Sequence, residues 1–313
     1  MERKVKLYYF PVSYYSQKAC IALEEMGVAY ESVLIDIHGS KPQKEAWYLR
    51  LNPNGTVPTL QDGDVIVTES EDIVTHVGKG SQLVPDVNTK YGQEVAKWRK
   101  TINAVSIETI TMGTVFNPEL SCSGFKAPKS VLNREKVKAS FQAQLDECKQ
   151  LMEKNPDLRK EYEAKINKLQ WRLQTYGDKS KITPALDNLE SLFDQLEQQL
   201  TKMAAGQSPN QWLCGPHFTA ADINLCITLG RLDLLGLAER YHSDTKRPRV
   251  HEYWRRAQMR PSINRVTVHA IRNTMRAMFG QSVRKTLPVL GGLLAVGLAA
   301  GLAVYFAQKR YVQ

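Results

Sequence analysis

The stretch Asn52-Pro53-Asn54-Gly55-Thr56-Val57-Pro58-Thr59-Leu60 decides the fold of the first part of the chain. Helical sequence from Gln43 to Leu51 comes before it, and two short strands, Thr59 to Gln61 and Val65 to Thr68, come at its end. The two strands are joined by Asp62-Gly63-Asp64, a composition typical of a tight hairpin turn. The quoted stretch therefore leads from a helix into a β-hairpin.

A strand, a helix and a second strand are expected before this stretch. Val5 to Phe10 is a short apolar and aromatic run, typical of a strand. Ser16 then opens a helix from Gln17 to Met26, and Tyr30 to Ile37 is interpreted as the second strand. With the hairpin and one more helix after it, this order predicts a thioredoxin-like N-terminal domain over residues 1–80.

After a linker near residues 80–90, residues 91–280 are interpreted as an all-helical C-terminal domain. Apolar residues recur there at intervals of three and four, the pattern of amphipathic helices. One such run follows Thr183-Pro184, which we take as a helix start, and Thr219 with Asp222 has the spacing of a capping box. The predicted fold class is α+β.

An inserted helical hairpin is expected at about residues 121–182. Apolar residues at helical spacing mark one helix before Asn155-Pro156-Asp157 and another after it. The remaining positions are rich in Lys, Glu, Asn and Gln, which is typical of a solvated surface. A second interpretation, that a cytosolic protein partner binds to this hairpin, stays open.

Composition places the folded part of the chain in a reducing compartment. The 313 residues suffice for two domains, and the 42% apolar and 24% charged content is that of an ordinary folded protein. The five cysteines form no Cys-x-x-Cys pair and are too sparse for a disulfide framework. We therefore expect the body of the protein in the cytosol.

The net charge of +10 is concentrated before the C-terminus. Between Arg240 and Lys285 there are twelve Lys or Arg residues against two acids, Asp244 and Glu252. A basic stretch before a hydrophobic tail suits anionic lipid headgroups, whereas nucleic-acid binding would need a recognition motif, and none occurs in the sequence. Membrane lipid, and no nucleic acid, is the predicted partner of this stretch.

The tail from Leu287 to Ala307 is predicted to be a transmembrane helix. Its 21 residues carry no charge, and as a helix they would extend ~31 Å, the thickness of a bilayer core. Only six residues follow, so the segment is a tail anchor, and a buried core helix is the rejected alternative. A weakly apolar tail with basic flanks favours a mitochondrial or peroxisomal outer surface over the endoplasmic reticulum.

The chain resembles the ganglioside-induced differentiation-associated protein 1 family, a tail-anchored mitochondrial branch of the glutathione-transferase superfamily. This resemblance implies a glutathione-transferase fold, a mitochondrial outer-membrane location and a role in mitochondrial fission and network organisation. It also implies a homodimer, since most transferases dimerise. The segments that carry it are Ser16-Gln17-Lys18, Asn117-Pro118-Glu119-Leu120, Asn155-Pro156-Asp157-Leu158, Trp212-Leu213-Cys214-Gly215, Phe218-Thr219-Ala220-Ala221-Asp222 and Thr228-Leu229-Gly230-Arg231-Leu232.

The resemblance also implies glutathione as ligand or co-substrate and assigns residues to it. Val57, before Pro58, would offer a backbone edge to the cysteine part, with that proline cis as in the family fold. Glu69 and Ser70 resemble the pair that meets the γ-glutamyl group at a helix N-terminus, where backbone donors favour an anion.

For the thiolate, the candidates are Ser13 and Ser16, because a hydroxyl beside a helix N-terminus lowers the pKa of a thiol. Structural roles compete with these assignments, since Ser16 is also a normal N-cap and the fold requires Pro58 in any case. No metal or other cofactor is expected, because the six histidines form no ligand motif.

Two functions of different class remain. In the first, the protein is a tail-anchored adaptor with a transferase-like body. In the second, it is an active glutathione transferase that conjugates glutathione to small electrophiles. The hairpin and tail favour the adaptor, as does Cys20, where soluble transferases often have Arg. Glu69-Ser70 favours the enzyme. A metaxin-like import component is a third interpretation, which leaves the hairpin unexplained.

Overall fold

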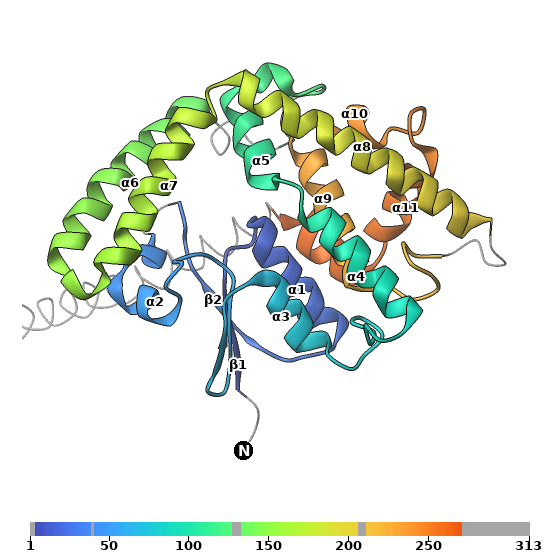
Figure 1. The fold of residues 1–313 in the computed structure, drawn as a ribbon, viewed down its shortest axis with the longest axis horizontal. Helices are drawn as coiled ribbons and strands as arrows, with labels where there is room; N and C mark the ends of the chain where they lie inside the picture. Colours follow the sequence, from blue (N-terminus) through green and yellow to red (C-terminus); the bar gives the residue numbers. More distant parts are fainter. Residues whose placement is uncertain (1–3, 39–40, 127–132, 206–210, 271–313) are drawn as a thin grey trace, which may run out of the picture. The chain divides into compact units, whose positions relative to one another are not determined.

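A four-stranded mixed sheet organises the first part of the chain (Figure 1). The computed structural model describes residues 4–38, 41–126, 133–205 and 211–270. The sheet has the order β2-β1-β3-β4. Its strands are β1 (Val5–Tyr9), β2 (Glu31–Leu34), β3 (Thr59–Asp62) and β4 (Val65–Val67).

Strand β1 is at the centre of the pairing. It runs parallel to β2, with Leu7 opposite Ser32, and antiparallel to β3, with Leu7 opposite Leu60. A parallel pair needs a crossover, which the helix α1 (Tyr14–Glu25) supplies. Leu7 and Leu60 are both buried, so this register directs apolar side chains into the core.

Helices cover the sheet through two separate apolar clusters. Helix α3 (Ser70–Gly78) packs against α1, and Leu23 and Ile73 of these helices share a cluster with Leu7. A second cluster joins Tyr48, on the short helix α2 (Ala46–Leu51), to Phe10, Ile35 and Val57. A 3-10 turn over Pro42–Lys44 precedes α2. This arrangement confirms the predicted thioredoxin-like layout.

Helix α1 begins earlier than the sequence pattern predicted. Ser13, and not Ser16, is its N-cap, because the Ser13 side chain accepts a hydrogen bond from the backbone N–H of Ser16 at 3.3 Å. That bond satisfies one of the free N–H groups of the first turn, so helical geometry starts at Tyr14.

The second part of the described chain is helical, and α9 (Ala220–Leu234) lies at its centre. This helix is buried over most of its length and packs against α1, α4 and α11. The other helices are α4 (Lys90–Asn103), α5 (Ile107–Phe116), α8 (Lys179–Ala204), α10 (Ala238–His242), α11 (Pro248–Gln258) and α12 (Pro261–Ile263), with a 3-10 turn at Pro118–Leu120 and a π-helical turn at Asn264–Val268.

Helix α8 also starts before the predicted Thr183-Pro184. Asp178 is the N-cap, and its carboxylate accepts hydrogen bonds from the N–H and the hydroxyl of Ser180 at 3.0 and 2.7 Å. Pro184 therefore lies inside the helix. The stronger Asp cap begins the helix one turn earlier, and proline is tolerated near its start.

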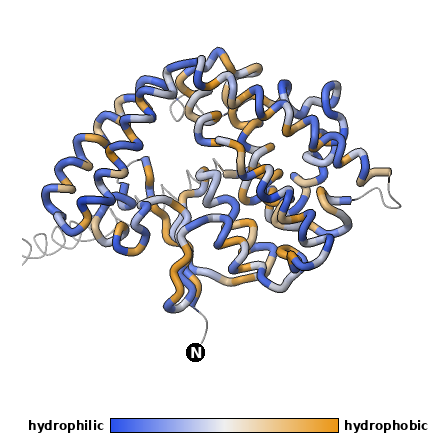
Figure 2. The backbone as a smooth tube through the Cα atoms, in the orientation of Figure 1, coloured by the Kyte–Doolittle hydropathy of each residue, from blue (hydrophilic) through white to orange (hydrophobic). Residues whose placement is uncertain are grey.

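The predicted hairpin is present as α6 (Arg134–Lys154) and α7 (Arg159–Thr175), with a 3-10 turn at Pro156–Leu158. Buried residues such as Leu145 and Leu169 join the two helices, while hydrophilic residues cover much of their surface (Figure 2). The hairpin ends at Thr175, and residues 179–182 belong to α8 and not to the insertion.

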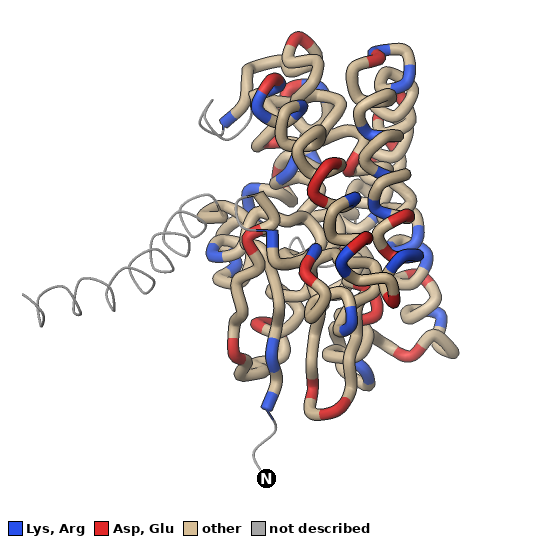
Figure 3. Tube along the Cα trace, turned by 90° about the vertical axis from the view of Figure 1, so that its left-hand side faces the viewer, with Lys and Arg blue, Asp and Glu red and all other residues tan. Residues whose placement is uncertain are grey.

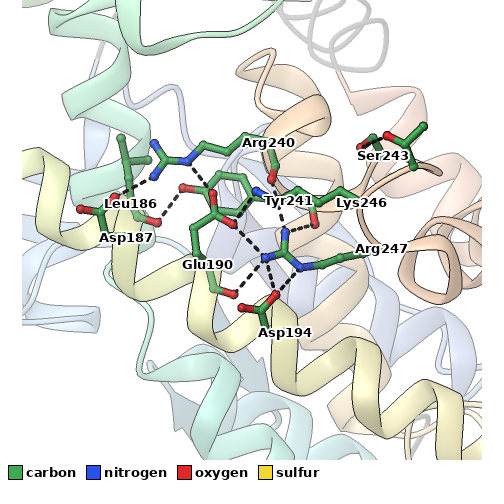
Figure 4. Close-up of polar contacts among 10 residues, drawn as sticks. Leu186, Asp187, Glu190, Asp194, Arg240, Tyr241, Ser243, Lys246 and Arg247 are labelled. Atoms are coloured by element: carbon green, nitrogen blue, oxygen red, sulfur yellow. Dashed lines mark hydrogen bonds and ion pairs between the residues drawn. The ribbon is translucent and has the colours of Figure 1, made fainter.

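Most cations in the described part of the basic stretch form ion pairs with acids of the fold. Arg247, only 3% exposed, donates to Glu190 at 2.8 Å and to Asp194 at 2.6 Å (Figure 4). Arg240 and Lys246 also pair with Glu190. Figure 3 views the side of the molecule on which α6 and α7 lie, where Lys and Arg are interspersed with Asp and Glu. The described part of the stretch thus makes ion pairs within the protein, and its contact with membrane lipid stays a prediction.

No helix of the described residues is long and apolar enough to cross a bilayer. The predicted transmembrane segment, Leu287 to Ala307, lies outside those residues.

A buried carboxylate, Asp222, links α9 to its surroundings. Its Oδ1 accepts from the N–H of Leu213 at 2.8 Å and from the Tyr253 hydroxyl at 2.9 Å. Its Oδ2 accepts from the N–H and the hydroxyl of Thr219, both at 2.8 Å. The predicted capping box is therefore confirmed and extended. Burial raises the pKa of Asp222, while these hydrogen bonds favour its ionised form.

Asp222→Ala is expected to lower the free energy of unfolding by about 3 kcal/mol or more, because it leaves several buried donors unpaired. Thr219→Ala removes only the cap and should cost about 1 kcal/mol. Urea-induced unfolding of the two variants measures both values. Equal losses would contradict the central position assigned to Asp222.

The Glu190 cluster predicts a loss of stability in acid. Partial burial would raise the pKa of Glu190, but hydrogen bonds from Arg247 and Arg240 lower it to about 2. A lowered carboxyl pKa stabilises the fold above the unfolded value of about 4.3. The shift corresponds to about 3 kcal/mol, or about 2 kcal/mol once solvent screening of this partly exposed group is allowed for, and the contribution disappears as pH falls towards 2.

The difference in unfolding free energy between the parent and Glu190→Gln should therefore shrink between pH 5 and pH 2. Asp187→Asn is the matched control, because Asp187 lies on the same helix as Glu190 and also pairs with Arg240, but it is 62% exposed. A difference that stays constant down to pH 2 would show that the ion pairs of Glu190 do not lower its pKa.

Candidate functional site

The loop between α2 and β3 presents an open backbone edge. The Val57-Pro58 peptide bond is cis, as expected. Among the described residues, neither the N–H nor the C=O of Val57 has a hydrogen-bond partner. The neighbouring Thr56 carbonyl is held by the Tyr48 hydroxyl at 2.7 Å and by the Asn52 amide at 3.0 Å. The loop is therefore anchored, while the backbone of Val57, a residue only 7% exposed, has no described hydrogen-bond partner.

The N-terminus of α3 lies beside this loop. Glu69 is its N-cap, and the Glu69 carboxylate accepts from the Asn54 side-chain amide at 3.1 Å. Ser70 is 6% exposed, and its hydroxyl makes no hydrogen bond to any described residue. The first N–H groups of a helix have no acceptor within the helix, so this end favours an anion.

The structure separates the two serines proposed for the thiolate. Ser16 is completely buried, and its hydroxyl accepts from the N–H of Phe10 at 3.3 Å. Ser13 is half-buried at the start of α1. Of the two, Ser13 is the hydroxyl that a ligand can reach, while Ser16 holds the turn that follows β1.

A buried polar cluster that the sequence did not reveal lies under the site. Lys18, with no exposed surface, donates to Glu71 at 2.7 Å and to Asn103 at 2.6 Å. Arg99 also pairs with Glu71. Burial would raise the pKa of Glu71, but Lys18 and Arg99 hold it below its usual value. The cluster fixes α1, α3 and α4 to one another.

Lys165 of the hairpin contacts the loop between α2 and β3, residues 52–58, which is called the ligand loop below. Its Nζ donates to the carbonyl oxygens of Asn54 at 3.2 Å and Gly55 at 3.0 Å. Gly55 has a φ of +51°, and a Cβ there would lie 2.6 Å from the carbonyl oxygen of Gln43 and 2.2 Å from this Nζ, so a side chain would strain the loop and displace Lys165. Burial lowers the pKa of Lys165 to about 8. Sequence reasoning named no hairpin residue, because the contact depends on how the hairpin docks.

The hairpin is also tied to the helical domain near the site. Glu108 of α5 accepts from Arg172 of α7 and from the Tyr176 hydroxyl, at 2.7 and 2.8 Å. Burial would raise the pKa of Glu108, but Arg172 and Lys168 hold it below its usual value. Tyr15 of α1 is 40% exposed. Partial burial raises the pKa of its hydroxyl, the charge of Glu108 raises that pKa further, and the charge of Arg172 opposes the rise.

Cys20 of α1 is not available as a reactive thiolate. Burial raises the pKa of Cys20 to about 12, and its side chain lies in the core under the sheet. Within the described ranges, no group of His, Cys, Asp or Glu could hold a metal ion. Any reactive thiolate would have to come from the ligand.

Family comparison agrees with this geometry. Residues 7–81 match the N-terminal domain of glutathione S-transferases, and residues 134–256 match their C-terminal domain. The first match contains Ser13, Val57, Glu69 and Ser70.

Similar curated proteins include ganglioside-induced differentiation-associated protein 1-like 1 of Homo sapiens, 28% identical over 98% of this chain and 87% of that protein. Glutathione S-transferase TCHQD of Arabidopsis thaliana is 26% identical over 84% of this chain and 89% of its own length. The tetrachloro-p-hydroquinone reductive dehalogenase of Sphingobium chlorophenolicum is 25% identical, with 85% and 96% covered.

Among solved structures, a beta-etherase from a Sphingobium strain superposes with a TM-score of 0.62 at 20% identity, covering 84% of this chain and 98% of that chain. Glutathione S-transferase-I bound with lactoylglutathione gives 0.57 at 21% identity, covering 85% and 99%. These likenesses show the fold. The chain thus belongs to the glutathione S-transferase superfamily and is related to the ganglioside-induced differentiation-associated protein 1 family.

Proposed function

We propose that this chain is a tail-anchored, glutathione-binding protein of the mitochondrial outer membrane, where its body faces the cytosol and takes part in mitochondrial fission. The observation that carries glutathione binding is the pairing of an open Val57 backbone edge with the unpartnered Ser70 hydroxyl at the N-terminus of α3. An extended peptide with an anionic end matches both features.

Membrane attachment is supported by the sequence of Leu287 to Ala307 and by relationship to the named family. The adaptor role is supported by the hairpin, which presents a largely hydrophilic surface and contacts the ligand loop through Lys165. A cytosolic protein bound on the hairpin could thereby respond to the ligand. We also propose that the protein forms a homodimer.

An active glutathione transferase is the second candidate function. Ser13 favours it, since a half-buried hydroxyl at a helix N-terminus can stabilise a thiolate. A theta-class transferase from Xanthomonas axonopodis, which shares the fold, has been solved with glutathione bound. Steady glutathione consumption by the intact protein with a small chlorinated aromatic electrophile would favour this candidate over the adaptor.

Ser70→Ala is expected to weaken glutathione binding by about 10- to 150-fold, because a hydrogen bond to a charged group is worth about 1.5 to 3 kcal/mol. Isothermal calorimetry on the full chain measures the affinity. Ser106→Ala is the matched control, since Ser106 is exposed and makes no side-chain cap hydrogen bond. No heat of binding in the parent protein at millimolar glutathione would refute the proposal.

Ala299→Arg is expected to release much of the protein from membranes. Ten Leu, Val or Phe residues in the segment supply ~3 to 6 kcal/mol toward insertion, and one central Arg costs ~2.5 to 3.5 kcal/mol. Carbonate extraction of mitochondria measures the outcome, with Ala299→Leu as control. If Ala299→Arg, or a chain ending at Lys285, resisted carbonate extraction, the tail anchor would be wrong. Peripheral attachment through the basic stretch would then be the better interpretation.

A further inference from the structure

A cavity of about 310 Å³ lies where α1, α9, α11 and the π-helical turn meet. That volume is at the lower end of the range for small-molecule sites. Its walls include Val12, Gln17, Arg231, Leu234, Trp254 and Val268. Val57, Glu69 and Ser70 are not among the lining residues, so the cavity is separate from the proposed glutathione contacts.

Arg231 is a cation without a counterion in this cavity. Its Nη2 donates to the carbonyl oxygen of Val12 at 2.7 Å, and among the described residues this is its sole hydrogen bond. No described carboxylate forms an ion pair with it, whereas Arg99, Arg247 and Arg260 each have one. Burial lowers the pKa of Arg231 to about 10, so the group stays charged at neutral pH.

The acid that also lines the cavity, Asp233, is already engaged. Its Oδ2 accepts from the Trp254 indole N–H at 2.8 Å, and its Oδ1 lies 3.2 Å from Nε2 of His242. Lys126 adds a second cation to the lining. The two cations, a half-buried Arg231 and an exposed Lys126, therefore outnumber the acid in the described lining, and a partly desolvated charge without a counterion is unfavourable.

The rest of the lining combines apolar residues with the polar side chains of Gln17, Gln258 and Thr267. Val12, Leu234 and Val268 line the cavity together with Trp254, whose indole N–H is occupied by Asp233. Gly230 lets the π-helical turn pack onto α9, since a Cβ there would lie 2.1 Å from the Thr267 methyl. The apolar walls are thus held in place by close packing of two elements.

We propose that this cavity is a binding site for a small organic carboxylate with a compact apolar body. The carboxylate pairs with the guanidinium of Arg231, whose planar donors match two carboxylate oxygens. The apolar body packs against Leu234 and Trp254. This site goes beyond the proposed glutathione binding and does not require it.

The test is calorimetry of the full chain in a non-ionic detergent with 4-phenylbutyrate, and with 4-phenylbutan-1-ol as the uncharged analogue. The carboxylate should bind without glutathione, and Arg231→Met should weaken it by about tenfold or more. The affinity for the alcohol should differ by less than twofold between the parent and Arg231→Met. Arg231→Lys, which keeps the charge but loses the planar donors, should give an intermediate affinity for the carboxylate.

Arg255→Met is the matched control, because Arg255 is exposed on α11 and outside the cavity lining, and it should bind like the parent. Thermal unfolding checks that each variant is folded. Equal carboxylate affinity in the parent and Arg231→Met would overturn the site, as would an equal loss for acid and alcohol. Ser70→Ala should leave this binding unchanged, so failure of glutathione binding is distinguishable from failure here.

Discussion

The buried carboxylate of Asp222 is the interaction on which the helical domain depends. It begins α9, accepts from the backbone of Leu213 and from Tyr253 on α11, and so joins three segments at one point. Because α9 packs against both α1 and α4, its position also sets where the thioredoxin-like part meets the helices. An ionised group so deeply buried persists only when its donors surround it.

The inserted hairpin contacts both the thioredoxin-like part of the chain and the other helices. Lys165 contacts the loop that presents Val57, Lys44 pairs with Glu147 of α6 at 2.7 Å, and Arg172 pairs with Glu108. Anything that moves the hairpin therefore changes the support of the ligand loop. This physical link is what an adaptor needs in order to couple a bound small molecule to a protein partner.

Much of the site was predictable because its parts are local. The candidates Val57 and Pro58 lie in one loop, and Glu69 and Ser70 are adjacent at a helix start, so the resemblance to transferases could assign them from short motifs. Lys18, Arg231 and Lys165 were missed because each acts through a residue more than fifty positions away. Neither composition nor periodicity contains information about such partners. Ser13 and Ser16 could be listed together from sequence, but only burial distinguishes them.

The sequence by itself determined the order of strands and helices, the capping box at Thr219 and the presence of an inserted hairpin, since each follows from periodicity and caps within a few residues. Only the tertiary structure decided how charge is used. Arg240 and Arg247 belong to a basic stretch in the sequence, yet in the fold they neutralise acids of α8. Arg231, by contrast, has no ion pair among the described residues. Electrostatic pairing depends on distance in space, and distance in space is set by packing between elements that lie far apart along the chain.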